Sequence, residues 1–109
     1  MLRTALLAVV LLPALASSHS TQTPQCEGCV GFAMAVKGLI HDDDSFDSNG
    51  SQDTKEEISE RCGPHFAFDS ELEGKCEKVV DQDYREIIAD VAQLTLNAFC
   101  FKHLGVCAP

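Results

Sequence analysis

Basic residues are scarce in this chain of 109 residues: eight Lys and Arg stand against 17 Asp and Glu, a net charge of −9 with His neutral. Proteins that follow the phosphates of a nucleic acid carry basic patches, so we expect no nucleic-acid partner. Strand patterns are also missing, because no stretch of useful length alternates apolar and polar residues. The sequence therefore predicts a small, acidic, all-α protein.

Motifs for catalysis are absent as well. The chain has no Gly-x-Ser-x-Gly, no His-Glu-x-x-His and no glycine-rich phosphate loop. A nucleophile would have to be a cysteine, and we expect all six cysteines to be paired. Cys26-x2-Cys29 also has the spacing of half a zinc site or of a redox pair. A zinc site would need a second close ligand pair, which only Cys100-x2-His103 approaches. A thioredoxin-like redox pair would need a βαβ setting, which the sequence does not show. We expect no enzyme activity, no cofactor and no metal.

One apolar run stands at the N-terminus and has the features of a secretory signal peptide. Arg3 precedes the run of residues 6–12, Pro13 ends it, and Ala14-Leu15-Ala16 fits a small-x-small cleavage site. The run is too short for a membrane anchor. We expect a signal peptide at residues 1–16 and a flexible lead-in at 17–25. The mature chain, with a net charge of −10 after loss of Arg3, would be secreted or reside in a lysosomal or other acidic vesicle lumen.

Helical periodicity begins at Cys26 and continues to Ile40, with apolar residues three and four apart. Three glycines weaken this segment, so contacts with the rest of the fold must hold it. The polar residues 41–53 predict a loop. A second helix is expected over residues 54–62, opened by a Thr54–Glu57 capping box and stopped by Gly63-Pro64.

Two further capping boxes predict the helices of the second half. Ser70 with Glu73 opens one, and Asp83 with Glu86 opens the longest amphipathic pattern, which runs through Phe99. Gly105 is expected to break the last turn before Cys107.

The six cysteines follow the spacing Cys26-x2-Cys29-x32-Cys62-x13-Cys76-x23-Cys100-x6-Cys107. An even number in a short secreted chain predicts a disulfide framework. If the terminal helices run antiparallel, nested bridges join Cys26 to Cys107 and Cys29 to Cys100; parallel helices would need crossed bridges. Cys62 and Cys76 would close the middle hairpin.

This cysteine order, on helices with apolar stripes, resembles the saposin B-type domain over residues 26–107. The intervals from Cys29 to Cys62 and from Cys62 to Cys76 are longer than usual in that family. The resemblance implies four to five amphipathic helices in two leaves, the nested pairing, and binding of lipids or perturbation of membranes without catalytic residues. It also allows a homodimer or higher oligomer, with lipid or a membrane surface as partner.

In such a fold the apolar sides of the two leaves cover each other while the leaves are closed. If the leaves open, the same apolar sides can face lipid. Either membrane permeabilisation, as in antimicrobial members, or lipid extraction would follow. The alternative is a secreted helical ligand or inhibitor that binds a protein. Ten residues are the expected lipid-facing candidates, although each is also compatible with a plain core position: Phe32, Met34, Val36, Leu39, Val80, Tyr84, Ile87, Val91, Leu94 and Phe99.

Acid pH is expected to strengthen lipid binding, because protonated His and carboxyl groups reduce the negative charge. His103 lies between the last two cysteines. Amoebapores are similar in carrying a His between theirs, at a different spacing, and this resemblance makes His103 the expected pH switch; the alternative is an exposed His at a helix C-terminus. Residues 42–60 hold eight acidic groups and one Lys, so most of the charge sits in one segment.

The acidic loop carries two further motifs. Asn49-Gly50-Ser51 is an N-glycosylation sequon, which predicts a glycan on Asn49. Residues 45–56 partly match a calcium loop, but Ser45 stands where Asp is needed, so a solvated acidic loop is the default.

Overall fold

The computed structural model describes residues 22–42 and 52–108. These residues form four longer helices and one short one, and no strand occurs among them. The expected signal peptide, most of the lead-in, Asn49 and most of the calcium-like segment lie outside the described residues. In chain order the helices are α2 (Pro24–Asp42), α3 (Gln52–Glu60), α4 (Cys62–Phe66), α5 (Ser70–Gln93) and α6 (Leu96–Leu104).

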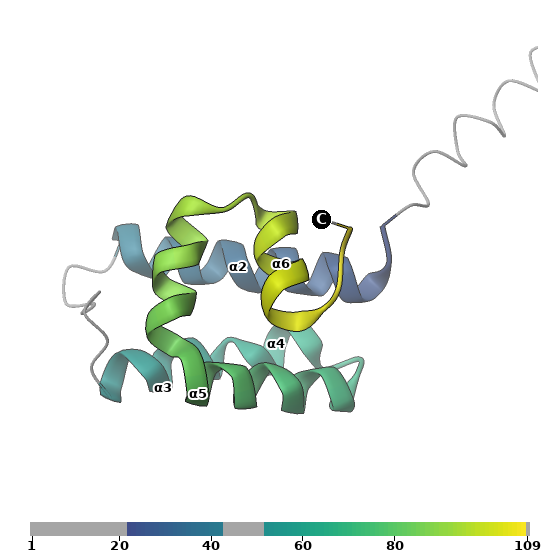
Figure 1. Cartoon of the computed structure of the whole chain (residues 1–109). Helices are drawn as coiled ribbons and strands as arrows, with labels where there is room; N and C mark the ends of the chain where they lie inside the picture. Colours follow the sequence, from purple (N-terminus) through teal and green to yellow (C-terminus); the bar gives the residue numbers. More distant parts are fainter. Residues whose placement is uncertain (1–21, 43–51, 109) are drawn as a thin grey trace, which may run out of the picture.

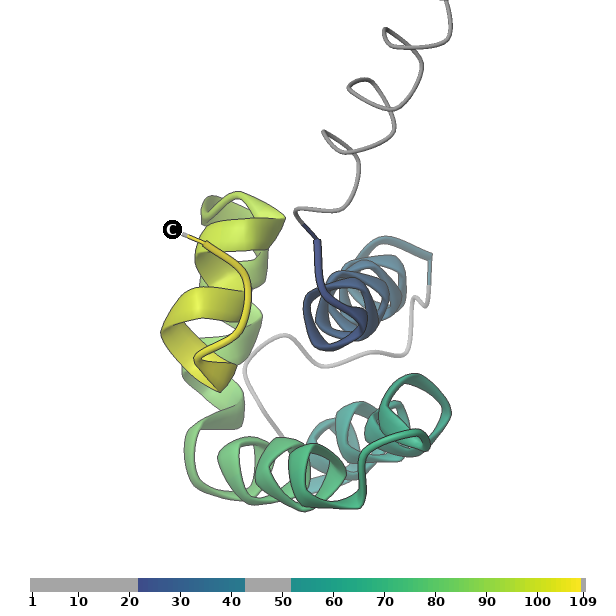
Figure 2. The same cartoon turned by 90° about the vertical axis from the view of Figure 1, so that its right-hand side faces the viewer.

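The helices form two layers (Figures 1 and 2). The first layer, called the terminal leaf below, contains α2, α6 and the second half of α5 (residues 84–93). The second, the middle leaf, contains α3, α4 and the first half of α5 (residues 70–82). Figure 2 looks nearly along α2 and shows the leaves meeting at the bend of α5. The all-α fold and the two-layer arrangement are those expected from the sequence.

Helix α2 begins two residues earlier than the apolar periodicity indicated. Pro24 occupies the first helical position, where its missing N–H and fixed φ are tolerated. The Thr23 hydroxyl accepts a hydrogen bond from the Cys26 N–H at 3.1 Å, which satisfies one of the free donors of the first turn. The end of the predicted lead-in is therefore part of the helix.

The predicted start and stop of the second helix are wrong. Helix α3 begins at Gln52, and Thr54 lies within its first turn, 2% exposed, instead of capping it. Gly63 and Pro64 do not end the structure either, since they form the interior of the short helix α4. Pro64 is tolerated there because it falls in the first turn, where its N–H would have no helical partner.

Helix α5 is capped by Asp69, not by Ser70 as the capping box predicted. The Asp69 side chain accepts a hydrogen bond from the Leu72 N–H at 3.1 Å, and Ser70 is the first helical residue. Asp83, the predicted start of the last helix, lies inside α5 with non-helical dihedral angles (φ −131°, ψ 29°). The third capping motif thus marks a kink within one helix.

The pattern predicted to run unbroken through Phe99 is interrupted at Leu94 and Thr95. Leu94 has extended dihedral angles, and the Thr95 hydroxyl caps α6 by accepting a hydrogen bond from the Ala98 N–H at 3.2 Å. As predicted, Gly105 ends α6. Its φ of 68° is the left-handed conformation that favours glycine at this position.

Candidate functional site

The apolar core lies between and within the two leaves, and it contains most of the expected lipid-facing residues. Three of the ten, Leu39, Tyr84 and Leu94, are partly buried. Met34 is different, because its side chain is 58% exposed on α2. In this closed arrangement the other six are core residues: Phe32, Val36, Val80, Ile87, Val91 and Phe99.

Each leaf is linked covalently within itself. In the terminal leaf, Cys26 pairs with Cys107 and Cys29 with Cys100, which joins α2 to α6 and the tail after it. In the middle leaf, Cys62 pairs with Cys76 and joins α4 to α5. This is the nested pairing expected for antiparallel terminal helices, and all six cysteines are used. Disulfides of this kind indicate an extracellular or other oxidising compartment.

Ion pairs follow the same division. Lys55 of α3 lies 2.9 Å from Asp81 in the middle leaf. Lys102 of α6 lies 3.0 Å from Glu86 and 2.7 Å from Asp90 in the terminal leaf. Among the described residues, therefore, no disulfide or ion pair joins one leaf to the other.

Asp83 is where the described chain passes from the middle leaf to the terminal leaf. Its non-helical dihedral angles break the ladder of α5 between Val80, packed in the middle leaf, and Ile87, packed in the terminal leaf. Kinks in helices occur where the hydrogen-bond ladder is interrupted. Helix α5 therefore bends at Asp83, where it passes from one leaf to the other.

The leaves also touch closely where α2 crosses α4. A Cβ atom at Gly28 would lie 2.7 Å from the carbonyl oxygen of His65, and one at Gly31 would lie 2.8 Å from its Nδ1. Only glycine permits this approach, which explains two of the glycines that weaken α2 intrinsically. Burial, followed by the nearby Arg61 charge, lowers the pKa of His65 below 6.5. A neutral imidazole thus belongs to the closed contact, a role the sequence did not indicate.

His103, the expected pH switch, lies inside the terminal leaf instead of being exposed. Its side chain is 6% exposed, its Nε2 lies 2.9 Å from Oδ2 of Asp90, and its ring packs 4.8 Å from the Phe99 ring. Lys102 donates to the same carboxylate, and this hydrogen bond is the main reason that the pKa of Asp90 is below its usual 3.8. The alternative of an exposed His at a helix C-terminus is wrong. Opening of the two leaves would leave this cluster intact.

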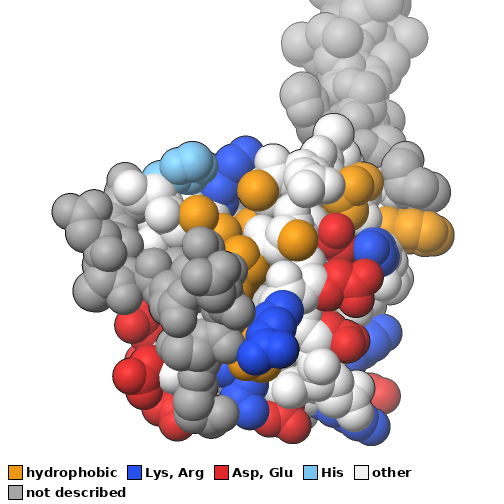
Figure 3. All heavy atoms as spheres, turned by 60° about the vertical axis from the view of Figure 1, so that its left-hand side comes forward, with side chains coloured by type: hydrophobic (Ala, Val, Ile, Leu, Met, Phe, Trp, Pro, Cys, Tyr) orange, Lys and Arg blue, Asp and Glu red, His pale blue; other side chains and the backbone are white. Residues whose placement is uncertain are grey.

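Exposed apolar side chains are dispersed over the described surface. Besides Met34, Phe68 in the turn before α5 is 55% exposed and Phe101 of α6 is 47% exposed. On the face drawn in Figure 3, hydrophobic side chains form small separated areas among polar and charged ones. On this face the exposed apolar side chains therefore form no single large patch. No helix in the described parts of the chain is long and apolar enough to cross a membrane.

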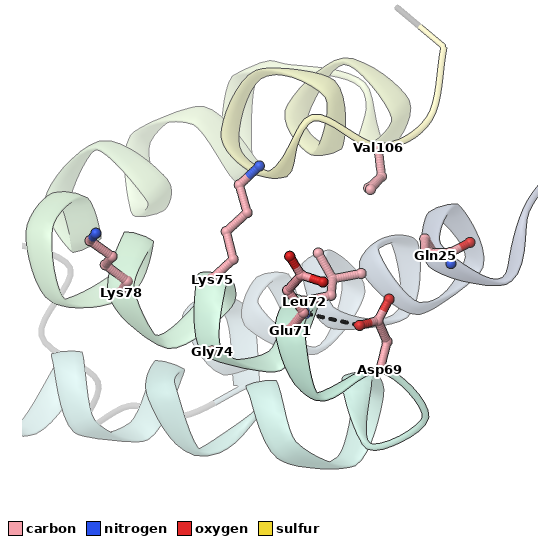
Figure 4. Close-up of a pocket in the computed structure, with 8 residues that line it drawn as sticks. All are labelled: Gln25, Asp69, Glu71, Leu72, Gly74, Lys75, Lys78 and Val106. Carbon is pink, nitrogen blue, oxygen red and sulfur yellow. Dashed lines mark hydrogen bonds between the residues drawn. The ribbon is translucent and has the colours of Figure 1, made fainter.

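A groove of about 490 Å³ opens at the edge where the leaves meet (Figure 4). The first half of α5 forms one side of it. Gln25 at the start of α2 and Val106 after α6 stand on the other side. Leu72 and Val106 are its apolar residues, and four charged side chains complete it: Asp69, Glu71, Lys75 and Lys78.

Comparison with known proteins gives no match: no protein-family model, curated protein or solved structure matches the chain.

Proposed function

We propose that this chain is a saposin-like protein that binds lipids or acts on membranes and has no catalytic activity of its own. The observation that carries the proposal is the division of the molecule into two internally linked leaves with an apolar core between them. Disulfides and ion pairs link each leaf internally, and the kink at Asp83 is the point about which the leaves would turn.

Energetics supports lipid as the partner of the opened form. Exposing a buried Phe, Val or Ile side chain to water costs roughly 1.5–3 kcal/mol, so exposing the six buried candidates would cost on the order of 10 kcal/mol. That is comparable to the whole stability of a typical domain of 5–15 kcal/mol, which makes an open form in water unfavourable. Lipid tails, or the opened surface of a second copy, would remove this cost.

The charge distribution favours action at acid pH. The mature chain has a net charge of −10 and would be repelled by anionic membranes at neutral pH. Of this charge, −7 belongs to residues 42–60, so the rest of the mature chain is close to balance. Acidification protonates carboxyl and His groups and so reduces the negative charge, although the pKa of His65 lies below 6.5 because of burial and the nearby Arg61 charge. This fits a secreted protein or one in a lysosomal lumen.

The test is a vesicle assay that scores dye leakage and lipid transfer in the same samples at pH 5 and pH 7.5. The mature chain with its disulfides intact should bind vesicles more strongly at pH 5. Leakage without transfer would indicate a permeabilising, antimicrobial type of action, and transfer without leakage would indicate lipid extraction. Equal binding at both pH values would contradict the acid dependence.

Absence of binding to any vesicle at either pH would contradict the proposal as a whole. The protein-binding alternative, a secreted helical ligand or inhibitor, would then be the better account. Sedimentation of the lipid-bound and lipid-free forms would show whether binding involves a homodimer or a higher oligomer.

A further inference from the structure

Lys75, which lines the groove in Figure 4, makes a hydrogen bond between the two leaves. Lys75, on α5 in the middle leaf, donates from Nζ to the carbonyl oxygen of Leu104, the last residue of α6, at 3.0 Å. The C-terminal end of a helix carries partial negative charge on its free carbonyls, which favours a cation there. Lys75 thus holds the end of the terminal leaf against the middle leaf.

This hydrogen bond differs from the ion pairs because it joins the two leaves, whereas the Lys55 ammonium reaches the terminal leaf only by lying 5.9 Å from the centroid of the Tyr84 ring, next to the kink. The ion pairs of Lys55 and Lys102 stay within one leaf, whereas the Lys75 bond must break when the leaves separate. The acceptor at Leu104 is a neutral carbonyl, and Lys75 itself is exposed to solvent. An ammonium group bonds more strongly to an anionic oxygen than to a neutral one, so an anion in the groove can compete for it.

The other residues of the groove indicate what kind of anion fits. Lys78 lies one helical turn from Lys75 and brings a second cation to the same end of the groove. Asp69 lies at the other end and already accepts the capping hydrogen bond from Leu72, while Glu71 lies between Asp69 and Lys75 (Figure 4). Leu72 and Val106 offer apolar contact beside these charges. A groove with cations at one end and apolar side chains in its wall matches an amphiphile better than a free ion.

We propose that this groove binds the anionic headgroup of a membrane lipid and that Lys75 couples this binding to opening of the leaves. The Lys75 ammonium exchanges the Leu104 carbonyl for a headgroup oxygen, which removes a polar contact between the leaves as the lipid arrives. This inference rests on the proposed function, because it specifies how the lipid starts the separation of the leaves.

The experiment compares Lys75→Met with Lys55→Met in the mature, disulfide-intact chain. Both variants lose one positive charge and keep an apolar stem, but Lys55 does not line the groove: it pairs with Asp81 and lies 5.9 Å from the centroid of the Tyr84 ring. Binding is measured at pH 5 to vesicles of phosphatidylcholine alone and of phosphatidylcholine with phosphatidylglycerol. Wild type should prefer the anionic vesicles, Lys75→Met should lose about fivefold or more of that preference, and Lys55→Met should keep most of it.

Two additions make the outcome decisive. Lys75→Arg, which restores the charge, should recover the preference for anionic vesicles. Inorganic phosphate, added without lipid, should leave the NMR signals of Lys75 and Gly105 unchanged, whereas anionic vesicles should shift them.

Equal losses in Lys75→Met and Lys55→Met would overturn the inference, because only general charge attraction would then remain. The same holds if phosphate alone reproduces the shift. In both cases wild type still binds vesicles and the proposed function stands. If wild type binds no vesicles, the proposed function and this inference are both contradicted.

Discussion

The Nε2 atom of His103 lies 2.9 Å from Oδ2 of Asp90, and both residues belong to the terminal leaf. His103, which lies between Cys100 and Cys107 and was the expected pH switch, therefore makes its contact within one leaf and not between the leaves. A charged imidazole beside the Asp90 carboxylate would hold α6 to α5 more firmly. Among the described histidines, the one at a contact between leaves is His65, which packs against Gly31.

The carboxylate of Asp90 provides the first prediction. Its pKa is held below 3.8 chiefly by the hydrogen bond from Lys102, so Lys102→Met should raise it toward that value. A carboxyl group with a lowered pKa stabilises the fold above its unfolded pKa, and this contribution is lost as the pH falls through the folded pKa. Carboxyl NMR titration measures the shift. Lys55→Met is the control, and an unchanged Asp90 pKa in Lys102→Met would contradict the assignment.

Two Gly→Ala substitutions should have opposite effects on stability, one at the close crossing of α2 and α4 and one on the exposed side of α5. Gly28→Ala should destabilise the protein by about 1–3 kcal/mol, because its Cβ would meet the His65 carbonyl oxygen at 2.7 Å. Gly74→Ala has nothing within 4 Å of its Cβ and should stabilise exposed α5 by about 0.5–1 kcal/mol. Denaturant unfolding measures both. A stabilising Gly28→Ala would show that the helices do not approach this closely.

His65 predicts a loss of stability in acid. Burial lowers its pKa below the usual 6.5, so the unfolded chain binds the proton more readily than the folded one. Its contribution is therefore full above pH 6.5 and is lost as the pH falls through the folded pKa. In His65→Gln, the free energy of unfolding should change less between pH 7.5 and pH 5 than in wild type. His41→Gln, at an exposed position, controls for removal of an imidazole; equal pH slopes in wild type and His65→Gln would refute the role.

The N-cap of α5 gives a prediction that separates the structure from the sequence pattern. Asp69→Ala should cost about 1 kcal/mol, because it removes the acceptor for the Leu72 N–H. Ser70→Ala should change the stability by less than about 0.5 kcal/mol, since Ser70 is an exposed first-turn residue. Thermal unfolding of the pair compares the two positions. A larger effect at Ser70 would support the capping box that the sequence indicated.

The all-α fold class was predictable, because three- and four-residue apolar spacing is a local feature of the sequence. The cysteine pairing was not local: the spacing left nested and crossed bridges open, and only the resemblance to the saposin B-type domain implied the nested set. The helix boundaries were harder to predict from the sequence. Thr54 and Ser70 are followed by Glu at the capping-box spacing, yet Thr54 is drawn into the core and Asp69 supplies the cap of α5. The choice among neighbouring polar residues depends on how the helices pack, which the motif alone does not contain.

The contacts between the leaves could not be derived from the sequence. Gly28 and Gly31 were visible as weak points of a helix, but their partner His65 lies more than thirty residues away. Lys75 looked like an ordinary surface residue until α6 placed the Leu104 carbonyl beside it. Contacts of this type depend on the crossing of separate helices, and no spacing along the chain encodes them.

The central claim is that the leaves separate about Asp83 when the protein binds lipid. Spin labels carried by unnatural amino acids at exposed Lys37 on α2 and Glu77 on the first half of α5 report the distance between leaves without disturbing the disulfides. Labels at Glu77 and Glu56 report a distance within the middle leaf. On binding to anionic vesicles at pH 5, pulsed electron paramagnetic resonance should show the Lys37–Glu77 distance lengthening while the Glu56–Glu77 distance stays constant. An unchanged Lys37–Glu77 distance in vesicle-bound protein would contradict the account.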